Sequence, residues 1–170
     1  RAGAPRWRSR PGAAQLRQSL KTADETEALG ARLAAARPRD LEQAAILYLT
    51  GDLGAGKTTL ARGFARACGI AAPVRSPTYT LVNAHEAGTL TLVHLDLYRL
   101  RDPGELEHLG LREWARSGCL WLIEWPERAA GLLPAADLII HLAAGAETHQ
   151  ADVFAGSPAG IVWLERARSS

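Results

Sequence analysis

A glycine-rich turn at residues 51–58 constrains the fold of this chain more than any other feature. It reads GDLGAGKT and matches the pattern G-x-x-x-x-G-K-[ST], with an apolar run at 45–49 before it and a segment of helical periodicity after it. Glycines let the backbone wrap a polyphosphate with its N–H groups pointing inward, at the start of a helix. The turn therefore predicts a nucleotide phosphate site between a buried strand and a helix.

Two polar residues of this turn have defined tasks in such a site. The ammonium of Lys57 supplies a positive charge for the β- and γ-phosphates, and the hydroxyl of Thr58 is a ligand for Mg²⁺. We therefore predict a nucleotide and Mg²⁺ as the ligands of this region.

A carboxylate that organises the metal is expected at the end of a neighbouring strand. The segment LTLVHLDLYRL at 90–100 provides Asp96 at the end of an apolar run, where an acid reaches Mg²⁺ directly or through water. The alternatives are that Asp96 caps the next segment or pairs with Arg99. His94 lies on the same strand face, and we interpret it as a packing residue.

Glu124 ends a second apolar strand, in the segment CLWLIEWPER at 119–128. Open α/β sheets bind their ligands at the carboxyl ends of their strands. Many ATPases carry a glutamate directly after the strand aspartate, but Leu97 occupies that position here. Glu124 is therefore predicted to replace it, by binding Mg²⁺ or polarising the attacking water, and the alternative is a strand-end carboxylate that faces solvent. We interpret the other nearby acids as solvated charges: Glu105, Glu107, Glu113 and Glu127.

Strand and helix patterns alternate over the first two thirds of the chain, and strands predominate afterwards. A T-x-x-E capping box at Thr22 predicts a helix that runs to about Arg37, and Gly69 is placed to end the helix after the glycine-rich turn. We predict an α/β fold of the P-loop NTPase type, a three-layer sandwich with a mixed, mostly parallel sheet flanked by helices. The other predicted elements are strands at 80–83, 90–95, 119–123 and 138–142, joined helices at 103–110 and 111–116, and a closing hairpin over 152–164 that turns around 156–160.

Charge divides the chain into two unequal parts. Residues 1–22 contain six basic residues and no acidic one, whereas the whole chain has a net charge of only +2, so the remainder is acidic overall. We expect a disordered basic leader at 1–18 and a single P-loop ATPase domain at 19–168. An organellar transit peptide and an RNA-contacting tail are the alternatives for the leader.

The composition predicts a globular protein of the cytoplasm. The chain is 47% hydrophobic and 22% charged, which is ordinary for a soluble domain, and no apolar run reaches the roughly 20 residues that span a membrane. Cys68 and Cys119 match no metal or disulfide spacing, so we expect both to be reduced core residues.

The remaining motifs narrow the class of nucleotide protein. A GTPase would carry an N-K-x-D element, which this sequence lacks, and a small-molecule kinase would carry an arginine-rich lid after the metal strand. Arg99, Arg101 and Arg112 are too few and too scattered for such a lid. We therefore predict a compact ATPase. Two alternatives stay open: an ATP-dependent interaction switch without essential turnover and, further from the pattern, a small-molecule kinase.

Five blocks of sequence resemble the TsaE family, also called YjeE. GDLGAGKTTLARGFARACG, VRSPTYTLVN, HLDLYRL, ELEHLGLREW and LIEWPER occur in the order and approximate spacing of that family, from about Thr22 to Leu142. The resemblance implies a small ATPase that acts with TsaB and TsaD in threonylcarbamoylation of adenosine 37 in tRNAs reading ANN codons. TsaD would transfer the group, tRNA would be contacted indirectly through the complex, and ATP hydrolysis would reset the complex.

The resemblance also implies roles for individual residues. Thr58 and Glu124 would bind Mg²⁺, with Asp96 as the strand acid beside them. Residues 76–80 would form a mobile segment over the γ-phosphate, the alternative being a simple loop that leads into a strand. Trp125 would line the nucleotide site or a partner surface, the alternative being core packing. The implied catalytic residues are Lys57, Asp96 and Glu124. The implied nucleotide-binding residues are Leu53, Gly54, Ala55, Gly56, Lys57, Thr58, Thr59, Thr78 and Trp125.

Two features bear on the activity of the isolated chain. No arginine finger is evident, with Arg75 before the mobile segment as the one candidate, so we expect slow hydrolysis without a partner. Where the family tends to carry an arginine in its last hairpin, residues 147–149 read Glu-Thr-His, which argues against base contacts from that region.

Overall fold

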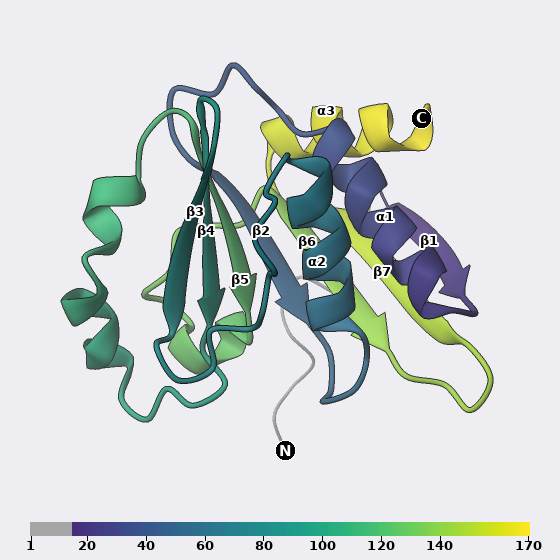
Figure 1. The fold of residues 1–170 in the computed structure, drawn as a ribbon, viewed down its shortest axis with the longest axis horizontal. Coiled ribbons are helices and arrows are strands. Elements are labelled where there is room, and N and C mark those ends of the chain that lie inside the picture. The colour runs from purple at the N-terminus through teal and green to yellow at the C-terminus, as the bar shows by residue number, and fades with distance from the viewer. Residues whose placement is uncertain (1–14) are drawn as a thin grey trace.

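One mixed β-sheet organises the protein in the computed structural model, which describes residues 15–170 (Figure 1). Its strands are β1 (Gln15–Leu20), β2 (Ala45–Thr50), β3 (Val82–Ala87), β4 (Leu90–Asp96), β5 (Cys119–Glu124), β6 (Leu138–Ala143) and β7 (His149–Ala155). Within the described residues their order is β1-β7-β6-β2-β5-β4-β3. The central strands β6, β2, β5 and β4 are parallel, and the outer pairs are antiparallel. The predicted mixed α/β sheet is therefore confirmed.

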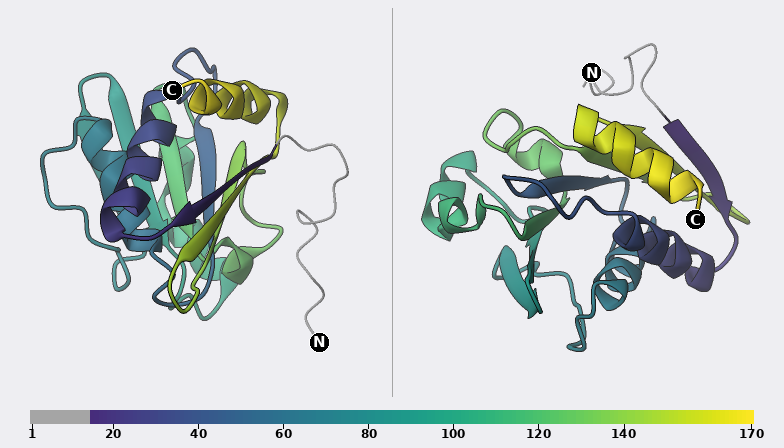
Figure 2. Two further views of the ribbon diagram at one scale, coloured as in Figure 1. Left: turned by 90° about the vertical axis from the view of Figure 1, so that its right-hand side faces the viewer. Right: turned by 90° about the horizontal axis from the view of Figure 1, so that it is seen from above.

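The two faces of the sheet are covered by different kinds of structure. On one face lie α1 (Ala23–Ala35) and α2 (Lys57–Ala67), with α3 (Pro158–Arg168) beside α1 (Figures 1 and 2). The other face packs against the 3₁₀ helices η2 (Pro103–Leu109), η3 (Leu111–Trp114) and η4 (Pro126–Ala129). Helical segments thus flank the sheet on both sides, but the second layer of helices consists of short 3₁₀ turns.

A close crossing of α1 and α2 fixes the position of the helix that follows the glycine-rich turn. A Cβ atom on Gly30 would lie 2.3 Å from the carbonyl oxygen of Leu60, and one on Gly63 would lie 2.2 Å from that of Glu27. Only glycine permits the two backbones to approach so closely. Arg62 Nη1 and Arg66 Nη1 donate to the carboxylate of Glu27 at 3.1 and 2.8 Å, which ties the same helices together at their surface.

The helix start predicted at Thr22 is confirmed by a side-chain cap, and a second side-chain cap occurs at Asp102. Thr22 accepts a hydrogen bond from the Glu25 N–H at 3.1 Å at the start of α1, and Asp102 forms a complete capping box with Glu105 at the start of η2. The segment after Pro103 is 3₁₀ rather than α-helical. β3 covers Val82–Ala87 in place of the predicted 80–83, so the hairpin turn between β3 and β4 lies at Gly88–Thr89.

The first described residues form a strand that the sequence did not indicate. β1 pairs antiparallel with β7, with Gln15 opposite Phe154 and Leu20 opposite His149. The predicted boundary between leader and domain at residues 18 and 19 therefore falls inside this strand. Residues 1–14 of the predicted leader lie outside the described part of the chain.

The predicted closing hairpin over 152–164 is wrong. β7 ends at Ala155 and α3 follows, because Ser157 caps the helix by accepting from the Gly160 N–H at 3.0 Å and Pro158 stands at its first position. The glycine that suggested a turn instead allows close packing, since a Cβ on Gly160 would lie 1.8 Å from the Asp137 carbonyl oxygen.

Several sequence expectations about the core are borne out. Cys68 and Cys119 are both buried and free. Burial raises the pKa of the Cys68 thiol to about 11, so this thiol is protonated and unreactive at neutral pH. In residues 15–170 no helix is long and apolar enough to cross a membrane.

Candidate nucleotide site

The carboxyl ends of three parallel strands bring the predicted site residues together. Leu49 of β2 is in register with Glu124 of β5, and Glu124 is in register with Asp96 of β4. The glycine-rich turn leaves β2 immediately after Thr50. Segments separated by up to 75 residues in the sequence therefore meet along one edge of the sheet, where ligands bind in open α/β folds.

The N-terminus of α2 has features that suit an anion. Gly56 is the N-cap of this helix with φ of +100°, a conformation that L side chains rarely adopt, and no side chain caps the helix. The first turn contains no acidic residue. The free N–H groups and the positive end of the helix dipole are therefore available to a phosphate.

The ammonium group of Lys57 lies inside the glycine-rich turn. Its Nζ donates hydrogen bonds to the carbonyl oxygens of Gly51 at 2.6 Å and Asp52 at 2.8 Å, and it lies 4.3 Å from the centroid of the Trp125 ring. Burial lowers the pKa of Lys57, and attraction to nearby carboxylates, Glu124 foremost, opposes that shift. A phosphate would replace two neutral carbonyl partners with charged ones, which form stronger hydrogen bonds with an ammonium.

These elements surround an open cleft of about 390 Å³, within the roughly 300–1,000 Å³ typical of small-molecule sites. Nearly all of the predicted nucleotide-binding residues line it. Ala55 is the exception: it is buried and does not line the cleft, although it belongs to the turn. The cleft is lined by Leu53, Gly54, Gly56, Lys57, Thr58, Thr59, Ser76, Thr78, Asp96, Tyr98, Glu124 and Trp125.

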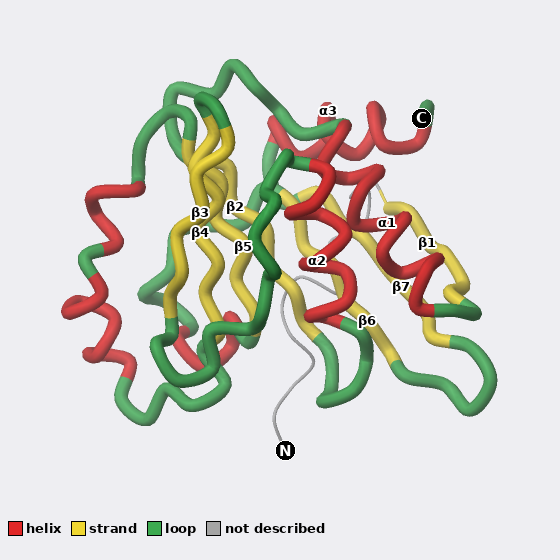
Figure 3. Tube along the Cα trace, in the orientation of Figure 1, coloured by secondary structure: helices red, strands yellow, loops and turns green. Residues whose placement is uncertain are grey.

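Asp96 accepts hydrogen bonds at both carboxylate oxygens. Its Oδ2 accepts from the hydroxyl of Ser76 and, at 3.2 Å, from that of Thr78, while its Oδ1 accepts from the Tyr98 N–H at 2.9 Å. Ser76 and Thr78 belong to the loop between α2 and β3, which runs along the sheet without regular structure (Figure 3). Asp96 therefore holds this loop against the cleft. It also caps the segment after β4 through the Tyr98 N–H, as the capping alternative expected, and the described residues show no ion pair between Asp96 and Arg99.

Glu124 is a buried carboxylate with a single side-chain partner. Its Oε1 accepts a hydrogen bond from His94 Nε2 at 2.9 Å, and the two residues are 2% and 0% exposed. Among the described residues no hydrogen bond reaches Oε2. The alternative in which Glu124 faces solvent is therefore wrong, because the neighbouring strands and His94 enclose it.

The donor set suits a magnesium ion that a nucleotide helps to bind. No group of three His, Cys, Asp or Glu residues that could hold a metal occurs in residues 15–170. The cleft does present the hydroxyl of Thr58 and the free oxygen of Glu124. Mg²⁺ prefers oxygen ligands and is commonly bound by one or two protein groups together with phosphates and water, so these residues fit that ion.

Two aromatic rings form one wall of the cleft. Trp125 adopts a left-handed backbone conformation with φ of +57°, and its ring centroid lies 4.9 Å from that of Tyr98. The guanidinium of Arg128 lies 5.5 Å from the centre of the Tyr98 ring. Trp125 lines the cleft and contacts Lys57, and it also packs against the core on this side of the sheet, so its predicted position at the site and the core-packing alternative both hold in part. Tyr98 was missed by sequence reasoning, and its place two residues after Asp96 is the signal that would have found it.

Two histidines contact the site without lining the cleft. His94 binds Glu124, which corrects its interpretation as a simple packing residue. His149 lies with Nδ1 3.1 Å from the carbonyl oxygen of Ala55, which indicates an N–H donated to the glycine-rich turn. Neither contact has a local sequence signal, because both partners come from other strands or loops.

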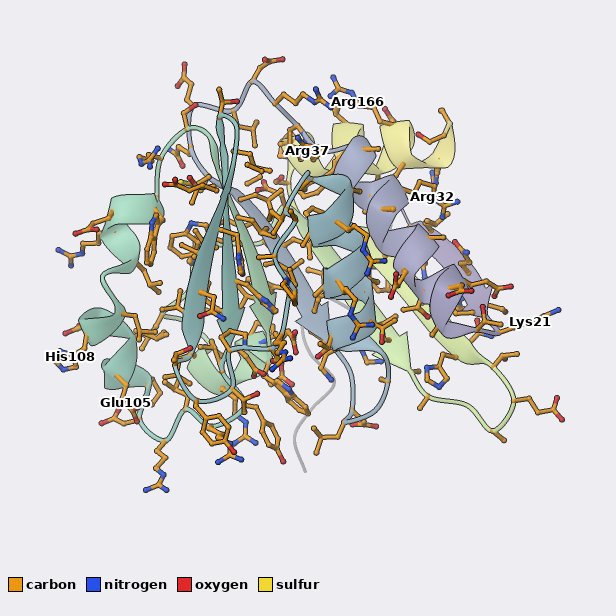
Figure 4. The ribbon with its side chains drawn as sticks, viewed as in Figure 1. Lys21, Arg32, Arg37, Glu105, His108 and Arg166 are labelled. Carbon is orange, nitrogen blue, oxygen red and sulfur yellow. The ribbon has the colours of Figure 1, made fainter. Side chains whose placement is uncertain are left out.

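Two other charged residues considered in the sequence, Arg75 and Glu105, lie away from the cleft. Arg75 lines a separate groove with Arg62 and Arg66. Glu105 lies on η2 at the periphery of the molecule, on the side opposite Lys21 and α1 (Figure 4). Its carboxylate accepts from the N–H groups of Arg101 and Asp102, so its role is helix capping.

Comparison with known families gives a result that agrees with this geometry. The family described as "Threonylcarbamoyl adenosine biosynthesis protein TsaE" matches residues 20–152 of the chain. The tRNA threonylcarbamoyladenosine biosynthesis protein TsaE of Haemophilus influenzae is 48% identical over 101 residues, which cover 59% of this chain and 64% of the relative. The protein of the same name from Bacillus subtilis is 41% identical over 121 residues, covering 71% and 72%. The aligned region thus spans slightly less than two thirds of the Haemophilus relative.

A solved structure shares the whole fold. The crystal structure of Bacillus subtilis YdiB superposes with a TM-score of 0.74 and 29% sequence identity, and the match covers 94% of this chain and 98% of the other. The arrangement of strands and helices described above is therefore also that of a known protein.

Proposed function

Because the chain belongs to the TsaE family of threonylcarbamoyladenosine biosynthesis proteins, we propose that it binds and hydrolyses ATP in support of that tRNA modification. One observation carries the proposal. The uncapped N-terminus of α2, the ammonium of Lys57 and the free carboxylate oxygen of Glu124 all face one cleft. This is the set of groups that phosphoryl transfer to water requires.

The protein groups act mainly by position and charge. Backbone N–H groups of residues 54–59 hold the β- and γ-phosphates, and Lys57 exchanges its carbonyl partners in the turn for phosphate oxygens. As negative charge moves onto the phosphates during bond cleavage, these donors stabilise it without having to reorganise. Trp125 and Tyr98 close one side of the cleft, which limits the access of bulk water to the phosphates.

Thr58 and Glu124 are the residues that would hold Mg²⁺ in this cleft. When bound, the ion neutralises charge on the phosphate oxygens and orients them. In the proposal Asp96 lies outside direct coordination, because three hydrogen bonds within the protein occupy most of the acceptor sites of its carboxylate. Its role in the proposal is to hold residues 76–80 over the γ-phosphate.

The partners proposed are TsaB and TsaD, with tRNA reached through their complex and the cytoplasm as the compartment. Among residues 15–170 no arginine lines the cleft, so no described residue takes the place of an arginine finger there. Hydrolysis by the chain alone should therefore be slow and should rise when the partners bind. Tyr79, which is 82% exposed next to Thr78, and Leu53, which is 65% exposed at the cleft, offer apolar contacts for such partners.

The test is the rate of ATP hydrolysis with and without purified TsaB and TsaD. We expect a low rate alone, an increase of at least about tenfold with both partners, and no activity for Lys57→Ala under either condition. Stimulation by a small phosphate acceptor in place of the partners would instead indicate a kinase.

The Glu124→Ala variant distinguishes the proposed ATPase from the alternative of an ATP-dependent interaction switch that needs no turnover. In a reconstituted reaction with substrates in excess, this variant should support only a first round of threonylcarbamoyl transfer if hydrolysis resets the complex. Sustained transfer over many cycles without hydrolysis would contradict the proposal and favour the switch.

A further inference from the structure

His94 makes a contact that packing alone does not explain. It is fully buried in β4, on the sheet face that α2 covers, among apolar neighbours such as Leu92 and Leu122. An imidazole buried without partners is costly, and a leucine would pack there without that penalty. The Nε2 atom of His94 nevertheless has one partner, Oε1 of Glu124 at 2.9 Å.

The hydrogen bond between His94 and Glu124 determines which ring nitrogen of His94 carries a hydrogen. An ionised carboxylate can only accept a hydrogen bond, so His94 Nε2 must be the donor. The other ring nitrogen, Nδ1, is buried without a partner among the described residues. An imidazole with hydrogen on Nε2 and none on Nδ1 leaves no N–H unpaired, so this is the form that the surroundings favour.

The same contact leaves Glu124 with one oxygen for a ligand. Glu124 lines the cleft, and its Oε1 is engaged by His94, so Oε2 is the oxygen available to a metal ion. A glutamate has three rotatable bonds, and a hydrogen bond from a fixed donor in a strand restricts them before the ligand arrives. His94 does not itself line the cleft, so it acts through Glu124 and touches no substrate.

We propose that His94 is a positioning residue, which donates a hydrogen bond from Nε2 to Glu124 Oε1 and thereby orients Oε2 toward the Mg²⁺ of the Mg²⁺–ATP complex. The inference rests on the proposed function, because it needs Glu124 to be a metal ligand. Residues that orient metal-ligating carboxylates typically change metal affinity or activity by about 10–100-fold when they are replaced.

The experiment measures binding of the fluorescent nucleotide mant-ATP to the full chain, first in EDTA and then as Mg²⁺ is added. For His94→Leu we expect an affinity in EDTA within about threefold of the unmodified protein, because the phosphate contacts of α2 remain. The Mg²⁺ concentration that gives half of the increase in affinity should rise by about 10–100-fold. An Mg²⁺ dependence equal to that of the unmodified protein would overturn the proposal and leave His94 as a packing residue.

Two further substitutions keep the test informative if His94→Leu does not fold. In His94→Gln the side-chain amide can reach the position of Nε2, so the Mg²⁺ dependence should be restored to within about threefold. In His94→Asn the amide reaches only the position of Nδ1, so the Mg²⁺ dependence should resemble that expected for leucine. Equal behaviour of the two variants would contradict the proposal.

The matched control is His85→Leu. His85 lies on β3 opposite Leu92, two residue pairs from His94 along the same hairpin, and its Nε2 is buried without a partner among the described residues. It makes no contact with Glu124, so its replacement should leave the Mg²⁺ dependence unchanged, and a shift as large as that of His94→Leu would overturn the assignment to His94.

If the unmodified protein binds no mant-ATP, the proposed function itself fails. If it binds but the His94 variants keep normal Mg²⁺ dependence, only the positioning role fails.

Discussion

The ends of β4 and β5 present two carboxylates that are neighbours in register but differ in their surroundings. Asp96 accepts three hydrogen bonds, two of them from the loop between α2 and β3. Glu124 accepts one, from a buried histidine, and keeps one oxygen free. Both side chains are buried and both line the cleft.

The difference shows that the role of a carboxylate depends on which of its lone pairs the protein already uses. Asp96 is engaged on both oxygens, so it is suited to holding residues 76–80 in place. Glu124 is engaged on one oxygen only, so it can offer the other to a metal ion. The following substitutions test this division of roles, beginning with the largest expected effect.

Glu124→Gln should reduce ATP hydrolysis by about 100-fold or more, because the amide keeps the shape of the side chain but loses the charge that a metal or attacking water needs. Binding of mant-ATP in EDTA should stay within about threefold. The matched control is Glu127→Gln, an exposed acid on η4 whose loss should change the rate by less than about threefold. Equal losses in the two variants would mean that general negative potential, and not the position of Glu124, supports hydrolysis.

Asp96→Ala should release the loop that Asp96 holds. Loss of three hydrogen bonds to a carboxylate should lower the free energy of local opening by about 3 kcal/mol, which corresponds to roughly 100-fold faster amide exchange at Leu81 and Tyr98. Hydrogen exchange measured by mass spectrometry checks this. Glu124→Gln should leave the exchange of residues 76–81 unchanged, and faster exchange there would break the distinction between the two carboxylates.

Thr78→Val should have the smallest effect of the three, because it removes one of the hydrogen bonds to Asp96 and preserves the shape of the side chain. We expect the free energy of local opening to fall by about 1 kcal/mol, which corresponds to roughly fivefold faster amide exchange at Leu81. Thr80→Val is the matched control, since the Thr80 hydroxyl donates to Asn83 and not to Asp96. If amide exchange at Leu81 is equally fast in the two variants, the hydrogen bond from Thr78 to Asp96 contributes nothing to holding the loop.

The elements that the sequence predicts correctly are those specified by residues that are close together in the chain. The capping box at Thr22, the buried run at 45–49 and the helix after the glycine-rich turn all depend on residues within a few positions of each other. β1 was missed because it is an edge strand whose partner, β7, lies more than 120 residues away in the sequence. The end of the chain was mispredicted because Gly160 was interpreted as a turn residue, whereas close packing against Asp137 explains it.

The candidate site also contains residues that the sequence identifies and residues that only the structure shows. Lys57, Thr58, Asp96 and Glu124 were identified from motif and strand position, and the structure brings all four to one cleft. The roles of His94 and Ser76 could not be read from sequence, since a histidine in a strand and a serine in a loop have many ordinary explanations. Only the pairing of β4 with β5 sets His94 beside Glu124.

The sequence by itself determined the glycine-rich turn and the candidate groups for phosphate and metal binding that stand in or near it. The spacing of the glycines, lysine and threonine of the turn depends on adjacent backbone geometry, which a short segment encodes completely. The tertiary structure decided which groups are already engaged and which are free. Which groups are engaged depends on contacts between strands that are distant in the sequence. Asp96 accepts hydrogen bonds on both oxygens and Glu124 on one, and this difference arises only when the sheet has formed.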